Sequence, residues 1–277
     1  MKKKYAYKIG IWLVTVLVAF VIMFPVVWII SSSFTPEDEL YTVPVSYLPS
    51  TPTLDNYKVM FKIMDVPRMA VNTLLIAIIS IVVTIFVAYT AGYGFARVQF
   101  RGKETVYSLL TFSAMLPMII TLVPLSRMML MLKLTDTIPG LSILYISSYI
   151  PFTTMIFTNS IHDVPIALDE AAEVDGAGLW RRMFAIILPM LKPVVATITI
   201  IIFIWSLNEF MIPLVFSSQK AVPLSLGISM VPREIQLAIP WEKISAMGTL
   251  IIAPIILFVT FFQRQIMDGL MAGGVKQ

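Results

Sequence analysis

The sequence predicts an all-α membrane protein with six transmembrane helices. Of its 277 residues, 58% are hydrophobic and 13% are charged, and the mean hydropathy is +0.88, far from the balance of a water-soluble domain. Several stretches without a charged side chain reach the length of about 20 residues that a helix needs to cross the hydrocarbon core. Backbone polar groups find no partners in lipid, so these stretches are expected to be helical.

The expected spans form one transmembrane domain, because the loops between them are too short for a separate soluble domain. The spans cover residues 9–31, 70–96, 105–131, 138–160, 194–216 and 244–264. In the second span, Ala88, Gly92 and Ala96 form a stripe of small residues that permits close contact between helices. The apolar run after the first lysines is longer than the core of a signal peptide, so we expect an uncleaved first helix.

The distribution of positive charge predicts that both termini are cytoplasmic. With this orientation the inside segments hold twelve of the 20 Lys and Arg residues, namely Lys2, Lys3, Lys4, Lys8, Arg97, Arg101, Lys103, Arg181, Arg182, Lys192, Arg264 and Lys276. The outside segments hold the other eight, where eight acidic residues balance them. Positive residues beside helix ends favour the cytoplasmic side. The net charge of +4 therefore needs no nucleic-acid partner.

The residue types present argue against several classes of membrane protein. The absence of cysteine excludes a disulfide framework and thiolate metal sites. An intramembrane serine protease would need a G-x-S-x-G turn and a histidine within a span, and a haem protein would need histidine ligands there. The sole histidine, His162, lies outside the expected spans. We therefore expect no enzyme and no metal site.

The longest inside loop, residues 161–193, has the pattern of two short helices. Pro165 suits a first helical turn, and Gly176 is a natural residue just beyond a helix end. Residues 179–187 can form a second helix, which Pro189 is expected to end.

This loop carries a motif that resembles the EAA loop of binding-protein-dependent ABC importers. The matching residues are Glu170, Ala171, Ala172, Asp175, Gly176, Ala177, Phe184, Leu188 and Pro189. In that family the loop forms coupling helices, which sit in a cleft of a cytoplasmic ATPase and transmit its closure to the transmembrane helices. The resemblance implies the same role for these residues and the six-helix ABC importer permease fold (MetI-like, type I).

Other segments are similar to carbohydrate permeases of the maltose-transporter MalG type. They are Asn72–Leu74, Gly94–Arg97, Phe100–Lys103, Pro124–Leu125, Trp205–Phe210 and the tail from Gln263 to Lys276. Gly178 departs from the family pattern, where Ser is frequent, and so does Gln277, where Gly is common. The likeness implies a permease that moves a sugar or oligosaccharide across the bacterial cytoplasmic membrane by alternating access.

The resemblance also implies the partners of the chain. They are a homologous second permease that completes a heterodimer, two copies of a cytoplasmic ATP-binding subunit, and an extracytoplasmic solute-binding protein. The chain lacks the G-x-x-x-x-G-K-[ST] phosphate-binding pattern. We therefore expect no cofactor in this chain, with ATP and Mg bound by the partner ATPase.

Trp205, Asn208 and Glu209 are candidates for the substrate path. Glu209 is the only carboxylate within the expected spans, and an intramembrane charge is costly enough to suggest a function. Amides and carboxylates bind sugar hydroxyls, and an indole stacks on a sugar ring. A polar clamp between helices is the alternative for the same residues.

Two other transport functions remain open from the sequence. One is an ABC permease for a different small polar solute. The other is a secondary transporter that works alone, which would be expected to show an inverted repeat and broken helices in both halves.

Overall fold

The computed structural model describes residues 2–44, 46–232 and 239–274, and these residues form helices joined by turns and loops, without a strand. The side chains of residues 2–6 and 264–274 lie outside the described part. The expected all-α class is confirmed. The chain forms two compact units, Met1–Pro67 with Gly227–Pro254, and Arg68–Leu226 with Ile255–Gln277.

The first unit contains a long apolar helix and the external segment that follows it. Its elements are α1 (Lys2–Ser33), α2 (Glu37–Leu40), α3 (Asp55–Ile63), a 3-10 turn (Ile228–Met230) and the first part of α14 (Trp241–Gly274). Apolar side chains along α1 are exposed, as expected of a helix that faces lipid. Asn56 of α3 donates to the carbonyls of Ser33 and Thr35 at 3.0 and 2.9 Å, which fastens α3 to the end of α1.

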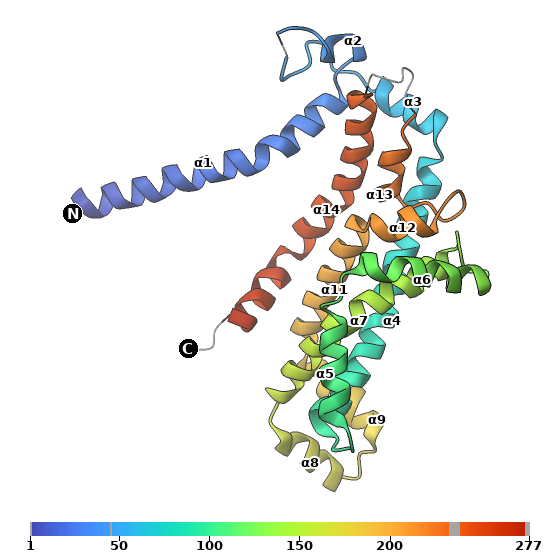
Figure 1. The fold of residues 1–277 in the computed structure, drawn as a ribbon. Helices are drawn as coiled ribbons and strands as arrows, with labels where there is room; N and C mark the ends of the chain where they lie inside the picture. Colours follow the sequence, from blue (N-terminus) through green and yellow to red (C-terminus); the bar gives the residue numbers. More distant parts are fainter. Residues whose placement is uncertain (1, 45, 233–238, 275–277) are drawn as a thin grey trace. The chain divides into compact units, whose positions relative to one another are not determined.

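The second unit contains the helices that surround the candidate site. They are α4 (Val66–Arg97), α5 (Lys103–Ser113), α6 (Met118–Met131), α7 (Ile138–His162), α8 (Ile166–Val174), α9 (Leu179–Arg181), α10 (Leu188–Met190), α11 (Lys192–Asn208), α12 (Met211–Phe216) and α13 (Leu224–Gly227). Figure 1 shows α4, α7 and α11 running side by side, with α8 and α9 together at one end. The fully buried side chains include Tyr89, Tyr145, Phe157 and Ile202.

The stripe of small residues on α4 allows the close helix contact that the sequence predicts. A Cβ atom placed on Gly92 would lie 2.7 Å from Phe157 Cβ and 3.1 Å from the Thr158 nitrogen of α7. Ala88 is fully buried. Any residue larger than glycine at position 92 would therefore push α4 away from α7.

Four of the described helices are long and apolar enough to cross a membrane, and there are up to six spans if each of two bent pairs is one span. The four are Tyr7–Ser33, Val66–Arg97, Ile138–His162 and Trp241–Gln263. The bent pairs are Lys103–Ser113 with Met118–Met131, at 98°, and Leu179–Met190 with Lys192–Asn208, at 79°.

Two expected spans are interrupted in the structure, and only the first interruption coincides with one of these bends. The span 105–131 is broken before Pro117, which begins α6 as its N-cap, because a proline disfavours helical geometry in the residue before it. The span 194–216 is broken after Asn208, where Glu209 takes an extended conformation and α12 follows from Met211. Composition located the apolar runs, and the first break falls at a proline within its run.

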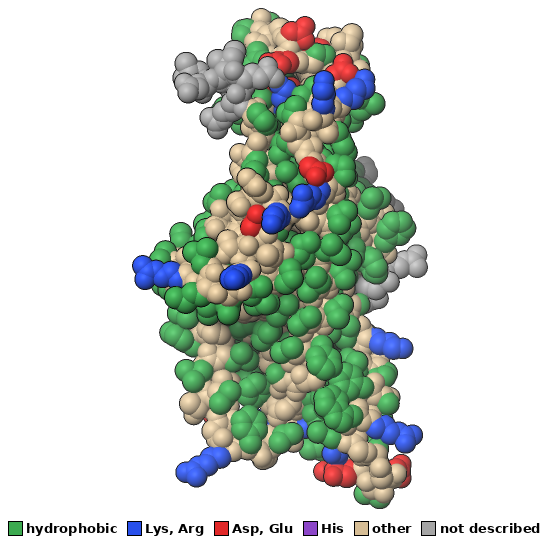
Figure 2. Space-filling view, turned by 90° about the vertical axis from the view of Figure 1, so that its right-hand side faces the viewer, with side chains coloured by type: hydrophobic (Ala, Val, Ile, Leu, Met, Phe, Trp, Pro, Cys, Tyr) green, Lys and Arg blue, Asp and Glu red, His purple; other side chains and the backbone are tan. Residues whose placement is uncertain are grey.

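Exposed apolar side chains cover much of the second unit. Figure 2 shows hydrophobic side chains over the middle of this face and charged ones at the end that carries α8. Leu109, Phe112 and Val123 are all more than half exposed. A hydrophobic middle with a charged end is the pattern that a membrane protein needs at the boundary between lipid and water.

Candidate functional site

The EAA segment forms α8 and ends in a Schellman motif. The Ala177 N–H donates to the Ala172 carbonyl at 2.9 Å, and the Gly176 N–H donates to the Glu173 carbonyl at 3.0 Å. Gly176 has φ of +80°, a conformation that glycine adopts without a steric cost. The predicted place of Gly176 just beyond the helix end is confirmed.

The second helix of the loop runs further than expected. It consists of α9, a π-helical turn (Arg182–Ile187) and α10, so it passes through Pro189 and reaches Met190. The prediction that Pro189 ends this helix is wrong. In the π-helical turn the Leu188 N–H donates to the Met183 carbonyl, five residues back. This wider turn relieves the clash of a proline ring with the carbonyl four residues before it.

The predicted coupling residues divide into an exposed group and a group that faces the helices. Glu170, Ala171, Asp175, Gly176 and Pro189 are exposed, Ala172 is buried, and Ala177, Phe184 and Leu188 are partly buried. Val174 and Trp180 beside them are 87% and 63% exposed. Large apolar side chains exposed at a charged end favour contact with another protein.

The inner group attaches the loop to α4. The Phe184 ring lies 6.0 Å from that of Phe86 and 5.5 Å from that of Tyr89, measured between ring centroids. The Tyr89 hydroxyl donates to the Met183 carbonyl at 2.6 Å. Phe184 is therefore a contact between the loop and the helix bundle.

A buried polar group joins α8 to the last turns of α4. The Tyr93 hydroxyl donates to Asp169 Oδ1 at 2.7 Å, and Arg97 Nε donates to Asp169 Oδ2 at 2.8 Å. Arg97 Nη2 also donates to the Val164 carbonyl at 2.6 Å. Asp169 and Tyr93 were not among the residues predicted from the sequence. The four-residue spacing of Tyr89, Tyr93 and Arg97 along one helix face was the available signal.

The substrate-path candidates do not converge on one polar site. Asn208 Nδ2 donates to the Ile204 carbonyl at 2.8 Å. Glu209 Oε1 accepts from the Ile212 N–H at 3.0 Å, so this carboxylate binds the first turn of α12, where an acid is favourable. Trp205 instead joins an aromatic group. The role of these residues in a substrate path stays a prediction.

The aromatic group around Trp205 also contains side chains that the sequence analysis missed. The Trp205 ring lies 5.6 Å from that of Tyr149 and 5.2 Å from that of Phe152. Tyr145 is 5.9 Å from Tyr149, and its hydroxyl is buried without a hydrogen-bond partner among the described residues. A buried hydroxyl usually has a partner, so an ordered water is the partner expected for this one.

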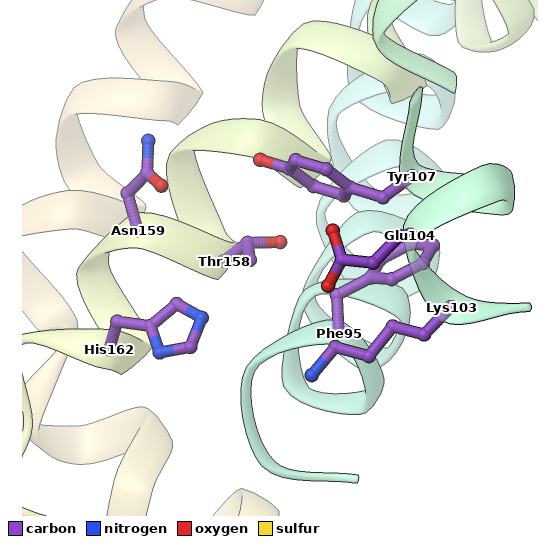
Figure 3. Close-up of a pocket in the computed structure, with 7 residues that line it drawn as sticks. All are labelled: Phe95, Lys103, Glu104, Tyr107, Thr158, Asn159 and His162. Carbon is purple, nitrogen blue, oxygen red and sulfur yellow. The ribbon is translucent and has the colours of Figure 1, made fainter. Parts of the chain in front are cut away.

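A pocket of about 220 Å³ lies between α5 and α7, beside α4. Its lining residues are Phe95, Lys103, Glu104, Tyr107, Thr158, Asn159 and His162, and Figure 3 shows Thr158 and His162 directed toward the α5 side chains. The lining combines one amine with one carboxylate and selects neither cations nor anions. The described residues contain no group of three or more His, Cys, Asp or Glu that could hold a metal ion.

A second, partly buried carboxylate holds a loop elsewhere in the same unit. Asp136, between α6 and α7, accepts from the backbone N–H groups of Ser218 to Ala221 at 3.0 to 3.2 Å. Burial raises the pKa of Asp136, but the hydrogen bonds from Lys220, Ser218, Ala221 and Gln219 outweigh it and hold this pKa well below its ordinary value.

The sequence places the coupling loop within a known family. Residues 88–270 match the family described as "Binding-protein-dependent transport system inner membrane component". The chain belongs to this family. It is therefore a multi-pass membrane component of a binding-protein-dependent transport system, as the EAA motif predicted.

Curated relatives match over almost the whole chain. The sulfoquinovosyl glycerol transport system permease protein SmoH of Agrobacterium fabrum is 31% identical over 255 residues, which are 92% of this chain and 89% of the relative. The trehalose transport system permease protein SugB of Mycobacterium tuberculosis is 31% identical and covers 92% of each chain. The trehalose/maltose permease MalG of Thermococcus litoralis is 27% identical over 94% of each.

A solved structure supports the fold. It is a bacterial ABC transporter involved in the import of the acidic polysaccharide alginate, with a TM-score of 0.81 over 95% of this chain and 98% of that chain. The sequence identity is 19%, so this likeness concerns the fold alone. The expected ABC importer permease fold is confirmed.

Proposed function

We propose that this chain is the permease subunit of an ATP-driven importer that carries a sugar or oligosaccharide across the cytoplasmic membrane by alternating access. The observation that carries the proposal is the coupling loop, which exposes Glu170, Ala171 and Asp175 on one side and is fixed to α4 on the other. A helix held in this way can receive force from a partner and pass it into the membrane. Relatives named for sulfoquinovosyl glycerol and trehalose transport support a carbohydrate substrate.

The same proposal assigns the chemistry to other subunits. The chain itself catalyses no reaction and holds no cofactor, and two copies of a partner ATPase bind ATP and Mg. A homologous second permease completes the membrane path, and an extracytoplasmic binding protein delivers the solute. Both termini lie on the cytoplasmic side with α8, where the exposed coupling residues Glu170, Ala171, Gly176 and Pro189 meet the ATPase.

The aromatic group around Trp205 is the part of the chain best suited to contact the sugar. Trp205 and Phe152 provide exposed ring faces, and the buried Tyr149 ring packs against Trp205. Asn208 lies one turn from Trp205 on the exposed side of α11. Glu209 contributes by fixing the break between α11 and α12.

The test is transport by the complete complex in proteoliposomes, with the binding protein and a set of labelled sugars outside and ATP inside. We expect ATP-dependent uptake by the complex and none by this chain alone. Uptake by the chain without an ATPase would overturn the proposal in favour of a secondary transporter. Uptake restricted to a solute other than a carbohydrate would overturn the substrate class only.

A variant tests the coupling residues directly. Glu170→Lys reverses an exposed charge on α8, and we expect it to reduce uptake while the complex still assembles and inserts. Asp163→Lys is the matched control, because Asp163 is an exposed acid just before α8 and outside the EAA segment. Equal uptake by both variants would contradict the docking role of α8.

A further inference from the structure

We propose that Arg97, Asp169 and Tyr93 form a mechanical link between α8 and α4, and that Arg97 and Asp169 are positioning residues for transport. Through this link, movement of the coupling helix draws the end of α4 with it. The inference rests on the proposed transport function and deepens it.

The link is buried between α8 and α4. The side chains of Arg97 and Asp169 are 8% and 7% exposed. Each Asp169 oxygen accepts one hydrogen bond from α4, at 2.7 and 2.8 Å. Arg97 also reaches the Val164 carbonyl, in the turn just before α8. The last turns of α4 thus hold both α8 and the chain that leads into it.

The other arm of the loop is attached to α4 differently. Phe184 packs against Phe86 and Tyr89, and the single polar contact shown there is that of Tyr89 with the Met183 carbonyl. Packed rings transmit a push. Separating Arg97 from Asp169 would instead leave two buried charges without partners, which is strongly unfavourable. The ion pair therefore also transmits a pull, as is needed when the ATPase opens again.

The four contacts on α4 occupy one face of the helix. Phe86, Tyr89, Tyr93 and Arg97 follow at intervals of three or four residues, which brings them onto the same side. A pull on this face moves α4 as a rigid body, and Gly92 on the same helix lies against α7. The motion of α8 is thereby passed into the membrane helices.

An ion pair within the loop provides the matched control. Arg182 pairs with Glu173, whose side chain is 67% exposed. Both residues belong to the coupling loop, so this pair cannot connect the loop to α4. Glu173→Gln removes the same charge as Asp169→Asn, from the same helix, and leaves the hydrogen bonds of Asp169 with Tyr93 and Arg97 in place.

The experiment measures ATP hydrolysed per sugar transported by the complete complex with its binding protein in proteoliposomes. We expect Asp169→Asn to raise this ratio by about tenfold, the size of a typical coupling between sites, and Glu173→Gln to leave it near the wild-type value. A purely structural role would reduce the amount of active complex, so hydrolysis and uptake would fall together and the ratio would stay constant. A wild-type ratio for assembled Asp169→Asn would overturn the link.

Tyr93→Phe tests the link between α8 and α4 if the Asp169→Asn complex does not assemble. This change removes one hydroxyl and keeps the ring. Because Arg97 still holds Asp169 in this variant, we expect the ratio to rise by only about twofold to threefold, the weak end of the range for one hydrogen bond. An unchanged ratio in Tyr93→Phe would then overturn the link. Failure of the proposed function is a different result, because the wild-type complex would then show no ATP-driven uptake.

Discussion

Asp136 and Asp169 are both carboxylates that join distant parts of the second unit, but their donors differ. Asp136 accepts from the backbone N–H groups of Ser218 to Ala221. Asp169 accepts from the side chains of Tyr93 and Arg97. Backbone donors fix the conformation of the loop that supplies them. Side-chain donors on one helix can follow that helix when it moves. We therefore call Asp136 the anchor, because it fixes a loop, whereas Asp169 transmits motion between two helices.

The largest expected effect is the loss of the anchor. Asp136→Ala leaves the N–H groups of Ser218 to Ala221 without their acceptor, so we expect the purified complex to lose about 3 kcal/mol of stability, the scale of hydrogen bonds to a charged group. The measurement is thermal unfolding in detergent, together with the ATP-to-sugar ratio. Asp55→Ala is the control, because Asp55 forms an exposed pair with Lys58 that contributes little. A changed ratio at normal stability would show that Asp136 transmits motion too.

A smaller loss of stability is expected when the packing of α4 against α7 is changed. Gly92→Ala would place a Cβ atom 2.7 Å from Phe157 Cβ, and overpacking of this kind costs about 2 kcal/mol. Gly94→Ala is the matched control on the same helix, since a Cβ atom there meets nothing within 4 Å. Thermal unfolding of the two variants distinguishes them. Equal stability would mean that α4 can shift freely against α7, and the transmission of motion by a fixed helix would be lost.

Glu209 tests whether the strength of an anchor follows its number of donors. Its carboxylate accepts from a single backbone N–H, that of Ile212, and Glu209→Gln keeps an oxygen in place. We expect a loss below about 1 kcal/mol, in the range of one ordinary hydrogen bond. Stability and sugar uptake are measured on the same preparation. Loss of uptake at normal stability would assign Glu209 to the substrate path.

The smallest expected effect is that of pH on the stability that Asp136 contributes. The pKa of Asp136 is depressed in the folded protein, so its stabilisation is complete above the unfolded pKa of about 4 and is lost as the pH falls through the folded value. The difference in stability between wild type and Asp136→Ala should therefore be the same at pH 8 and pH 5. Unfolding curves at both values provide the check. A difference that shrinks by pH 5 would mean that the carboxylate is not held by these N–H groups.

Much of the candidate site could be predicted from the sequence because its signals are local. The place of Gly176 follows from the rules for helix ends, and Glu170 and Asp175 belong to a short motif that is read directly from the sequence. The effect of Pro189 could not be predicted in this way. A proline usually ends a helix, and only the backbone of residues 182–188 shows the π-helical turn that lets the helix continue.

The sequence by itself determined the membrane class, the positions of the apolar runs and the family. These properties depend on composition and on short motifs, which need no knowledge of distant contacts. Only the tertiary structure decided which distant residues hold the coupling loop and the loop at residues 218–221 in place. Arg97 and Asp169 are 72 positions apart, and Asp136 meets a loop 82 positions later. Such pairs arise when whole helices pack together, and no local periodicity records which helix faces will meet.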